Sequence, residues 1–90
     1  MKNLALSDET RPIVKSSLDL KRKIFEKNLN EYQKRLSQYE KNHKMNSRTF
    51  KKKFDAGELG DDRVWFDWMY VYSAYKETKK KLRLLESVIL

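Results

Sequence analysis

The chain has no cysteine, only two glycines and a single proline among its 90 residues. The lack of cysteine excludes a disulfide framework and a thiolate metal site. Sandwiches and barrels need many turn residues, so the scarcity of glycine and proline indicates a helical protein instead. No segment approaches the roughly 18 consecutive apolar residues of a membrane span, and residues 1–11 lack the apolar core of a secretory signal. We therefore expect a cytoplasmic protein that does not bind membranes.

Charge is abundant and mostly positive. Charged residues make up 38% of the chain, and the formal net charge is +8. Such a balance fits binding to a polyanion, binding to an acidic protein, or lysines that keep amphipathic helices soluble. The basic residues are spread widely along the sequence, so composition alone does not choose among these three explanations.

Two long segments have apolar residues at every third or fourth position, apart from one gap in each, at Lys21 and at Lys79. This is the spacing of one face of an α-helix. The first segment is 12–43, and its stripe consists of Val14, Leu18, Phe25, Leu29, Tyr32, Leu36 and Tyr39. The second is 62–88, with a stripe of Trp65, Trp68, Met69, Tyr72, Tyr75, Leu82, Leu85 and the adjoining Ile89. Residues 1–10 are polar and aperiodic, and we predict a flexible arm there. The pattern predicts an all-α fold, a long antiparallel, coiled-coil-like helical hairpin in a single domain over residues 1–90.

A short third helix is expected in the connection, over residues 47–56. Asn46 or Ser47 is a good N-cap for this helix. Two phenylalanines four positions apart give the helix one apolar face, and Gly57 can end it in a left-handed conformation. A turn over residues 58–62 then separates this short helix from the last long helix.

Several apolar residues fall outside the two stripes and have no packing partner in a simple hairpin. A chain this short buries only about 60–70% of the surface that its unfolded form exposes, so additional cover is expected. We predict a homodimer, with self-association through the surplus residues Ile13, Leu20, Ile24, Leu84 and Val88.

An aromatic segment, residues 65–72, follows an acidic loop. Most of its rings lie on the inner stripe, which explains them as core residues. Phe66 and Tyr70 lie well off that stripe, and large aromatic residues are favoured anchors of protein interfaces. We predict that a partner, either a second copy or a different, basic protein, binds through Leu59, Asp61, Asp62, Phe66 and Tyr70.

Residues for catalysis or metal binding are few. The single histidine, His43, falls near a predicted helix end, where capping explains it without chemistry. No serine lies in the strand–turn–helix context of a nucleophile. The acidic residues around the second turn do not have the alternating spacing of a calcium loop. We therefore predict no enzymatic activity, no metal site and no cofactor.

Nucleic acid is the main alternative to a protein partner. The chain has three basic triplets, at residues 21–23, 51–53 and 79–81. In a hairpin, the first and the last of them would meet at the end that carries the termini. Such a patch would bind nucleic acid in a salt-sensitive, sequence-independent way, although no recognised base-reading motif is present. The residues of this patch are Lys21, Arg22, Lys23, Lys79, Lys80, Lys81 and Arg83.

The centre of the chain resembles a known group of proteins. It reads Met-x-Ser-x-x-Phe-x-x-Lys-Phe-x-x-Gly-Glu-Leu-Gly-Asp-Asp, from Met45 to Asp62. This pattern is similar to that of short, helical prokaryotic proteins of uncertain function that look like the antitoxin halves of two-protein toxin–antitoxin modules. Together with Trp68, a predicted coiled helix before this centre and a Tyr-rich helix after it, the resemblance covers about half of the chain. It implies neutralisation of a partner protein. A left-handed Gly57 and helix capping by Asp61 or Asp62 would also account for the motif as part of the fold.

The sequence therefore predicts a protein-interaction module that binds and neutralises a partner protein as an antitoxin does. A basic nucleic-acid-binding protein and a structural homo-oligomer are the two alternatives.

Overall fold

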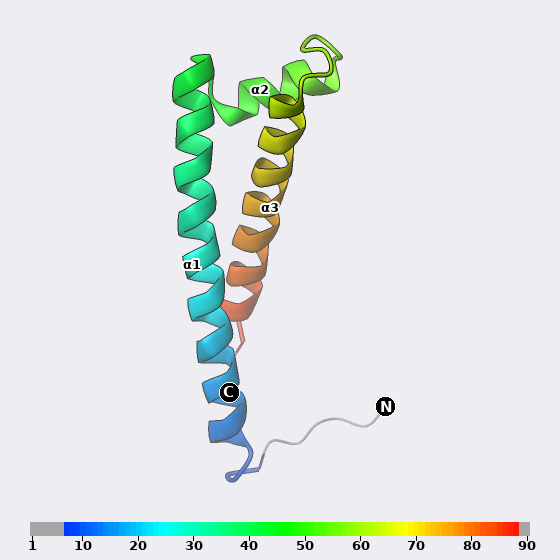
Figure 1. Cartoon of the computed structure of the whole chain (residues 1–90). Helices are drawn as coiled ribbons and strands as arrows, with labels where there is room; N and C mark the ends of the chain where they lie inside the picture. The colour runs from blue at the N-terminus through cyan, green and yellow to red at the C-terminus, as the bar shows by residue number, and fades with distance from the viewer. Residues whose placement is uncertain (1–6, 89–90) are drawn as a thin grey trace.

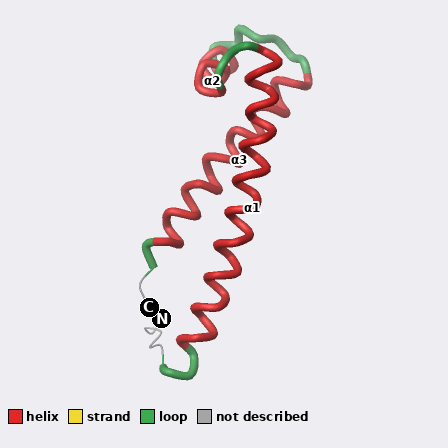
Figure 2. The backbone as a smooth tube through the Cα atoms, turned by 90° about the vertical axis from the view of Figure 1, so that its left-hand side faces the viewer, coloured by secondary structure: helices red, strands yellow, loops and turns green. Residues whose placement is uncertain are grey.

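The computed structural model describes residues 7–88, which form three α-helices. Helix α1 spans Arg11–His43, α2 spans Ser47–Asp55 and α3 spans Arg63–Glu86. Figure 1 shows α1 and α3 side by side in opposite directions, with α2 lying across the end where the chain turns. The perpendicular view in Figure 2 shows the same narrow rod, whose principal dimensions are 55 × 27 × 18 Å. This is the all-α hairpin with a short connecting helix that the apolar periodicity predicts. We call the end covered by α2 the closed end and the opposite end the open end.

The observed helix bounds agree with the predicted segments 12–43, 47–56 and 62–88 to within two residues. The largest difference is at the end of α3. There the Ser87 hydroxyl donates a hydrogen bond to the Leu84 carbonyl oxygen (2.7 Å), and the helix ends two residues earlier than predicted. A serine hydroxyl commonly competes in this way with the backbone for a carbonyl at a helix end.

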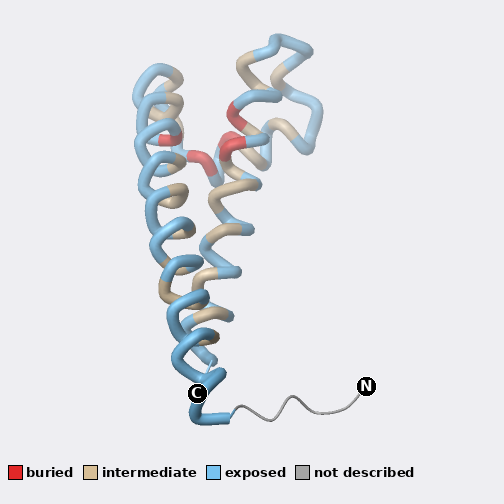
Figure 3. The backbone as a smooth tube through the Cα atoms, turned by 60° about the horizontal axis from the view of Figure 1, so that its bottom comes forward, coloured by how far each residue is buried: buried red, intermediate tan, exposed pale blue. Residues whose placement is uncertain are grey.

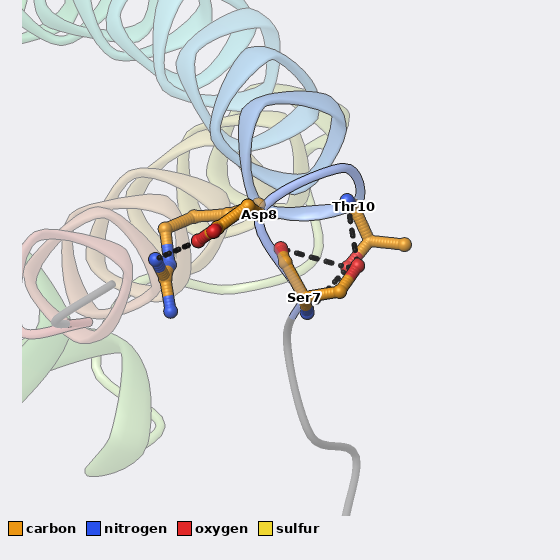
Figure 4. A network of polar contacts seen from close by, with 4 residues as sticks. Ser7, Asp8 and Thr10 are labelled. Atoms are coloured by element: carbon orange, nitrogen blue, oxygen red, sulfur yellow. Dashed lines mark hydrogen bonds and ion pairs between the residues drawn. The ribbon is translucent and has the colours of Figure 1, made fainter.

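A hydrogen-bonded turn precedes α1 (Figure 4). The backbone N–H of Ser7 donates to Thr10 Oγ1 (3.0 Å), and the backbone N–H of Thr10 donates to Ser7 Oγ (3.1 Å). Asp8 pairs with Arg11 at 3.4 Å. Of the predicted flexible arm, residues 1–6 lie outside the described residues, and residues 7–10 form this turn, in which the two hydroxyl residues satisfy each other's backbone donors.

The connection from α1 to α2 is tight and well capped. Lys44 adopts a left-handed conformation (φ 54°) that ends α1. Asn46 is the N-cap of α2, and its side chain accepts a hydrogen bond from the Thr49 backbone N–H at 2.8 Å. The Asn46 cap is confirmed, whereas the left-handed Lys44 was not predicted because non-glycine residues rarely adopt positive φ.

Two glycines shape the connection from α2 to α3. Gly57 and Gly60 have φ values of 73° and 82°, a region that is costly for residues with a Cβ. Asp62 occupies the N-cap position of α3, but its side chain makes no capping hydrogen bond. The left-handed Gly57 is confirmed, and the expected capping by an Asp62 side-chain hydrogen bond is wrong. Asp61 makes no such bond either within the described chain.

The seam between α1 and α3 follows the two predicted stripes. Every stripe residue in the described range is buried or half-buried, and only Ile89 lies outside that range. The stripe on α3 was incomplete, because Val71 is fully buried and was not assigned to it. Where the predicted stripes break at Lys21 and Lys79, the half-buried positions are the neighbouring Arg22 and Thr78. The seam is therefore continuous in space but partly polar toward the open end.

The fully packed core lies at the closed end. Four apolar side chains are buried there, Leu36, Phe50, Trp68 and Val71, contributed by all three helices. Figure 3 shows the buried positions gathered near the junction with α2, while the seam toward the open end is only half-buried. A two-helix seam has water on both sides, so complete burial requires the third helix.

Candidate interaction surfaces

A chain of side-chain hydrogen bonds fixes α2 against both long helices. The backbone N–H and the hydroxyl of Ser47 both donate to Glu40 Oε2, each at 2.8 Å. The Trp68 indole N–H donates to Ser47 Oγ at 3.0 Å, and the Phe50 ring stacks on Trp68 with a centroid distance of 3.9 Å. Because one residue of each helix takes part, this bridge fixes how α2 crosses the two long helices at the closed end.

His43 has a packing position in the structure. Its ring lies 4.8 Å from the centroid of Trp65 and 5.5 Å from that of Trp68. The side chain is half-buried at the last turn of α1. The ring of the single histidine is therefore part of the aromatic cluster at the closed end.

An exposed aromatic face runs along the start of α3. Phe66 is 52% exposed and Tyr70 is 68% exposed. The half-buried Phe54 of α2 meets the Phe66 ring edge-on at 5.5 Å. We call Phe54, Phe66 and Tyr70 the aromatic face. Phe66 and Tyr70 are one helical turn apart, so they form one apolar strip on the helix surface.

The acidic loop, residues 56–62, adjoins the aromatic face. It contains Glu58, Asp61 and Asp62 and no basic residue, and all three carboxylates are exposed. None of the three has an ion-pair partner among the described residues. Leu59, which was grouped with them as a partner-binding residue, is half-buried against the core. Leu59 therefore has a packing contact within the chain, and the carboxylates do not.

A second exposed apolar surface lies at the open end, and we call it the open-end face. It comprises the five residues predicted for self-association, which come from the first half of α1, the end of α3 and the residues that directly follow α3. All five are exposed to about half or more, as the helical periodicity predicts for residues outside the stripes: Ile13, Leu20, Ile24, Leu84 and Val88.

The structure divides the predicted basic patch. Lys79, Lys80 and Arg83 line a groove of about 660 Å³ along α3. Lys81 and the triplet at residues 21–23 are not among its lining residues, and Arg22 instead lines a separate hollow of about 220 Å³ with Leu85 and Val88. The groove, which we call the basic groove, is completed by Arg48 and Lys51 of α2 and by Tyr72, Ser73, Tyr75, Lys76 and Glu77 of α3. Sequence reasoning missed Arg48 and Lys51 because their place depends on how α2 crosses the hairpin.

Comparison with known proteins gives no match to any family model, curated protein or solved structure. Within the described residues, no helix has the length and apolar character needed to cross a membrane. The same part of the chain contains no group of three or more His, Asp or Glu side chains placed to hold a metal ion. The function must therefore be argued from the surfaces themselves.

Proposed function

We propose that the protein is a protein-interaction module that binds and neutralises a partner protein as an antitoxin does, through the aromatic face and the acidic loop. The observation that carries this proposal is the exposure of Phe66 and Tyr70 after all three helices have packed. Aromatic side chains bury a large area with few rotatable bonds and are over-represented among the residues that dominate binding energy. Two such rings within one helical turn form an anchor for a groove on a partner.

Local charge indicates the chemistry of the partner surface. The whole chain carries +8, yet residues 56–62 contain three carboxylates and no base. Asp67 in the next turn is paired with Arg63 at 3.7 Å, so the excess negative charge stays in the loop. Charged residues at the rim of an interface steer encounter and fix orientation. The partner is therefore a protein with an apolar pocket and a basic rim.

The resemblance of the central motif to antitoxin-type proteins agrees with this surface. Positive φ angles account for Gly57 and Gly60 as parts of the fold. Asp62 lies at the N-cap position of α3, where its charge favours the helix dipole, but it makes no capping hydrogen bond, and both Asp61 and Asp62 are exposed. Groups that the fold does not use are available to a partner, and covering a basic partner surface would neutralise a protein that acts on an anionic substrate.

The test uses the protein encoded by the neighbouring gene as the probe, co-expressed with this chain. We expect the two proteins to co-purify and expression of this chain to relieve any growth defect caused by the other. Phe66→Ala and Tyr70→Ala should each raise the dissociation constant about 10- to 100-fold, which is the effect expected of residues that anchor an interface. Gln38→Ala, at an exposed position of α1 outside all the surfaces described above, serves as the control.

Circular dichroism should show unchanged helicity for all of these variants, because neither ring is buried. Equal binding by the wild type, Phe66→Ala and Tyr70→Ala would contradict the assignment of this face. An unchanged affinity of the double variant Asp61→Asn/Asp62→Asn would contradict the charge argument alone.

We also propose that two copies of the chain associate through the open-end face. Both helices contribute exposed apolar side chains there, and the seam beneath them contains no fully buried residue within the described range. A symmetric pair places the same patch of each copy against the other, so each chain covers what its partner exposes. This arrangement leaves the aromatic face at the closed end accessible.

Sedimentation equilibrium tests this association. The wild type should have twice the 10.9 kDa mass of one chain, and Leu20→Glu/Ile24→Glu should have the mass of a monomer with its helicity retained. The double variant Lys27→Gln/Lys34→Gln makes the same change in net charge at exposed positions of the same helix. It should remain a dimer, and a wild type that is monomeric at high micromolar concentration would refute the proposal.

A further inference from the structure

The basic groove concentrates positive charge that the fold does not neutralise. It is lined by six cationic side chains and one carboxylate, that of Glu77. Lys51 is paired with Asp55. The other five cations, Arg48, Lys76, Lys79, Lys80 and Arg83, have no ion pair within the described part of the chain. Such a density of like charge is unfavourable unless an anion is bound.

Most of the charges that α3 contributes to the groove follow one helix face. Tyr72, Lys76, Lys79 and Arg83 are spaced four, three and four residues apart, so they lie along one side of α3. From Lys76 to Arg83 the cations of this row span seven residue steps, about 10 Å at 1.5 Å per residue. Arg48 and Lys51 of α2 border the same groove. A line of charges this long matches a chain of anionic groups better than a single small anion.

Aromatic rings are interleaved with these charges. The Lys76 Nζ lies 5.1 Å from the centroid of the Tyr72 ring, and the Lys79 Nζ lies 5.7 Å from that of Tyr75. Both tyrosines are half-buried. A positively charged groove with aromatic side chains is the usual combination in proteins that bind single-stranded nucleic acid, because phosphates pair with the cations and bases stack on the rings.

A second hollow of about 410 Å³ adjoins the groove and shares Tyr72 and Tyr75 with it. Its polar lining consists of Gln33 and Ser37 on α1, together with Glu40 and Ser47, which are hydrogen-bonded to each other. An amide and a hydroxyl next to aromatic rings provide hydrogen-bond donors and acceptors for the edge of an unpaired base. The hollow thus lies where a base would enter if the phosphates followed α3.

We propose that the basic groove binds single-stranded nucleic acid, with phosphates on the cations of α2 and α3 and a base at Tyr72 and Tyr75. A duplex hides the faces of its bases, so it would use the charges and leave the tyrosines unused. An acidic protein segment would likewise use the charges without needing the rings or the adjoining polar hollow.

This site is separate from the surface in the proposed function. At 100° per residue, the strip through Tyr72 and Arg83 and the strip through Phe66 and Tyr70 are about 120° apart around α3. The two ligands therefore do not compete for the same side chains. Phe66→Ala should leave nucleic-acid binding unchanged, so failure of either proposal is recognisable independently of the other.

The experiment measures fluorescence anisotropy of labelled oligo(dT), oligo(U) and a duplex of equal length with the full chain. We expect the single strands to bind at least tenfold more tightly than the duplex at moderate salt. The logarithm of the association constant should fall with the logarithm of salt concentration by about 0.7 for each phosphate contacted. Removing two contacts in Lys79→Gln/Arg83→Gln should reduce that slope by about 1.4 and weaken binding at least tenfold.

The matched control is Lys21→Gln/Lys23→Gln, which removes the same charge from a triplet outside the groove. It should lower affinity less than threefold. Tyr72→Leu should weaken binding of single strands about tenfold, and Tyr72→Phe, which keeps the ring, should restore it. Circular dichroism of each variant confirms that the helices remain.

Three results would overturn the proposal. The first is equal binding of duplex and single strand, together with an equal loss of affinity in Lys79→Gln/Arg83→Gln and in Lys21→Gln/Lys23→Gln. This result would indicate general electrostatic attraction. The second is displacement of oligo(dT) by polyglutamate at equal charge concentration, which would indicate an acidic protein ligand. The third is absence of binding at low salt.

Discussion

Ser47 is a small residue with a large structural role. It is the only buried polar residue in the described part of the chain, and its hydroxyl accepts from Trp68 while donating to Glu40. A buried polar group that loses its partner costs about 1–3 kcal/mol. The bridge is therefore favourable only when all three residues are present.

Replacing Ser47 with alanine should lower the free energy of unfolding by about 1–3 kcal/mol, because the buried indole N–H of Trp68 loses its acceptor. Urea denaturation followed by circular dichroism measures this change. The matched control is Ser73→Ala at an exposed position of α3, where the effect should stay within about 0.5 kcal/mol. Equal stability of both variants would show that the hydrogen-bond bridge contributes nothing.

At the scale of helices, most of the fold could be predicted from the sequence. Stripes of apolar residues gave the length and inner faces of both long helices, and Asn46 and Gly57 marked the ends of α2. These signals are local, since each depends on residues within one or two turns. Val71 was missed because it lies at the edge of the predicted stripe and becomes buried only where α2 closes the hairpin.

The candidate sites were predicted less completely for the same reason. The exposure of Phe66 and Tyr70 follows from their angle on α3 and could be predicted. The basic groove could not, because Arg48 and Lys51 reach it only through the crossing of α2 over α3. Charge runs in a sequence do not show which basic residues share a surface, since consecutive helical residues point 100° apart.

Helix α2 should depend strongly on its N-cap, because nine residues are too few for a helix that is stable by itself. Asn46→Ala removes the acceptor for the Thr49 backbone N–H and should lower the free energy of unfolding by about 1 kcal/mol. Asn46→Asp keeps an acceptor and is the control, with a loss of less than about half that size. Thermal denaturation of the three proteins provides the comparison, and an Asp variant as unstable as the Ala variant would argue against capping.

The molecule as a whole has one well-packed end and one thinly packed end. All the fully buried side chains lie where three helices meet, and the half of the hairpin beyond them has only one seam. Amide groups in thinly packed segments open at lower free-energy cost than those in a core. The two ends should therefore differ in local stability while belonging to one domain.

Hydrogen exchange read by mass spectrometry should detect this difference. Amides at residues 15–25 and 79–86 should exchange faster than those at residues 32–43 and 65–75. Because a second copy would cover the open-end face, the faster group should slow as protein concentration increases, and the slower group should not change. A uniform exchange rate along α1 would contradict the unequal packing.

Both tryptophans, Trp65 and Trp68, lie at the closed end, within the aromatic cluster. The chain therefore carries a natural optical label on one extremity only. Indole emission will report the loosening of that extremity, whereas far-ultraviolet ellipticity averages over every turn of the rod. If heat unwinds the open end first, ellipticity will decline before indole emission changes. The difference in temperature between the two transitions will measure how independently the open and closed ends melt.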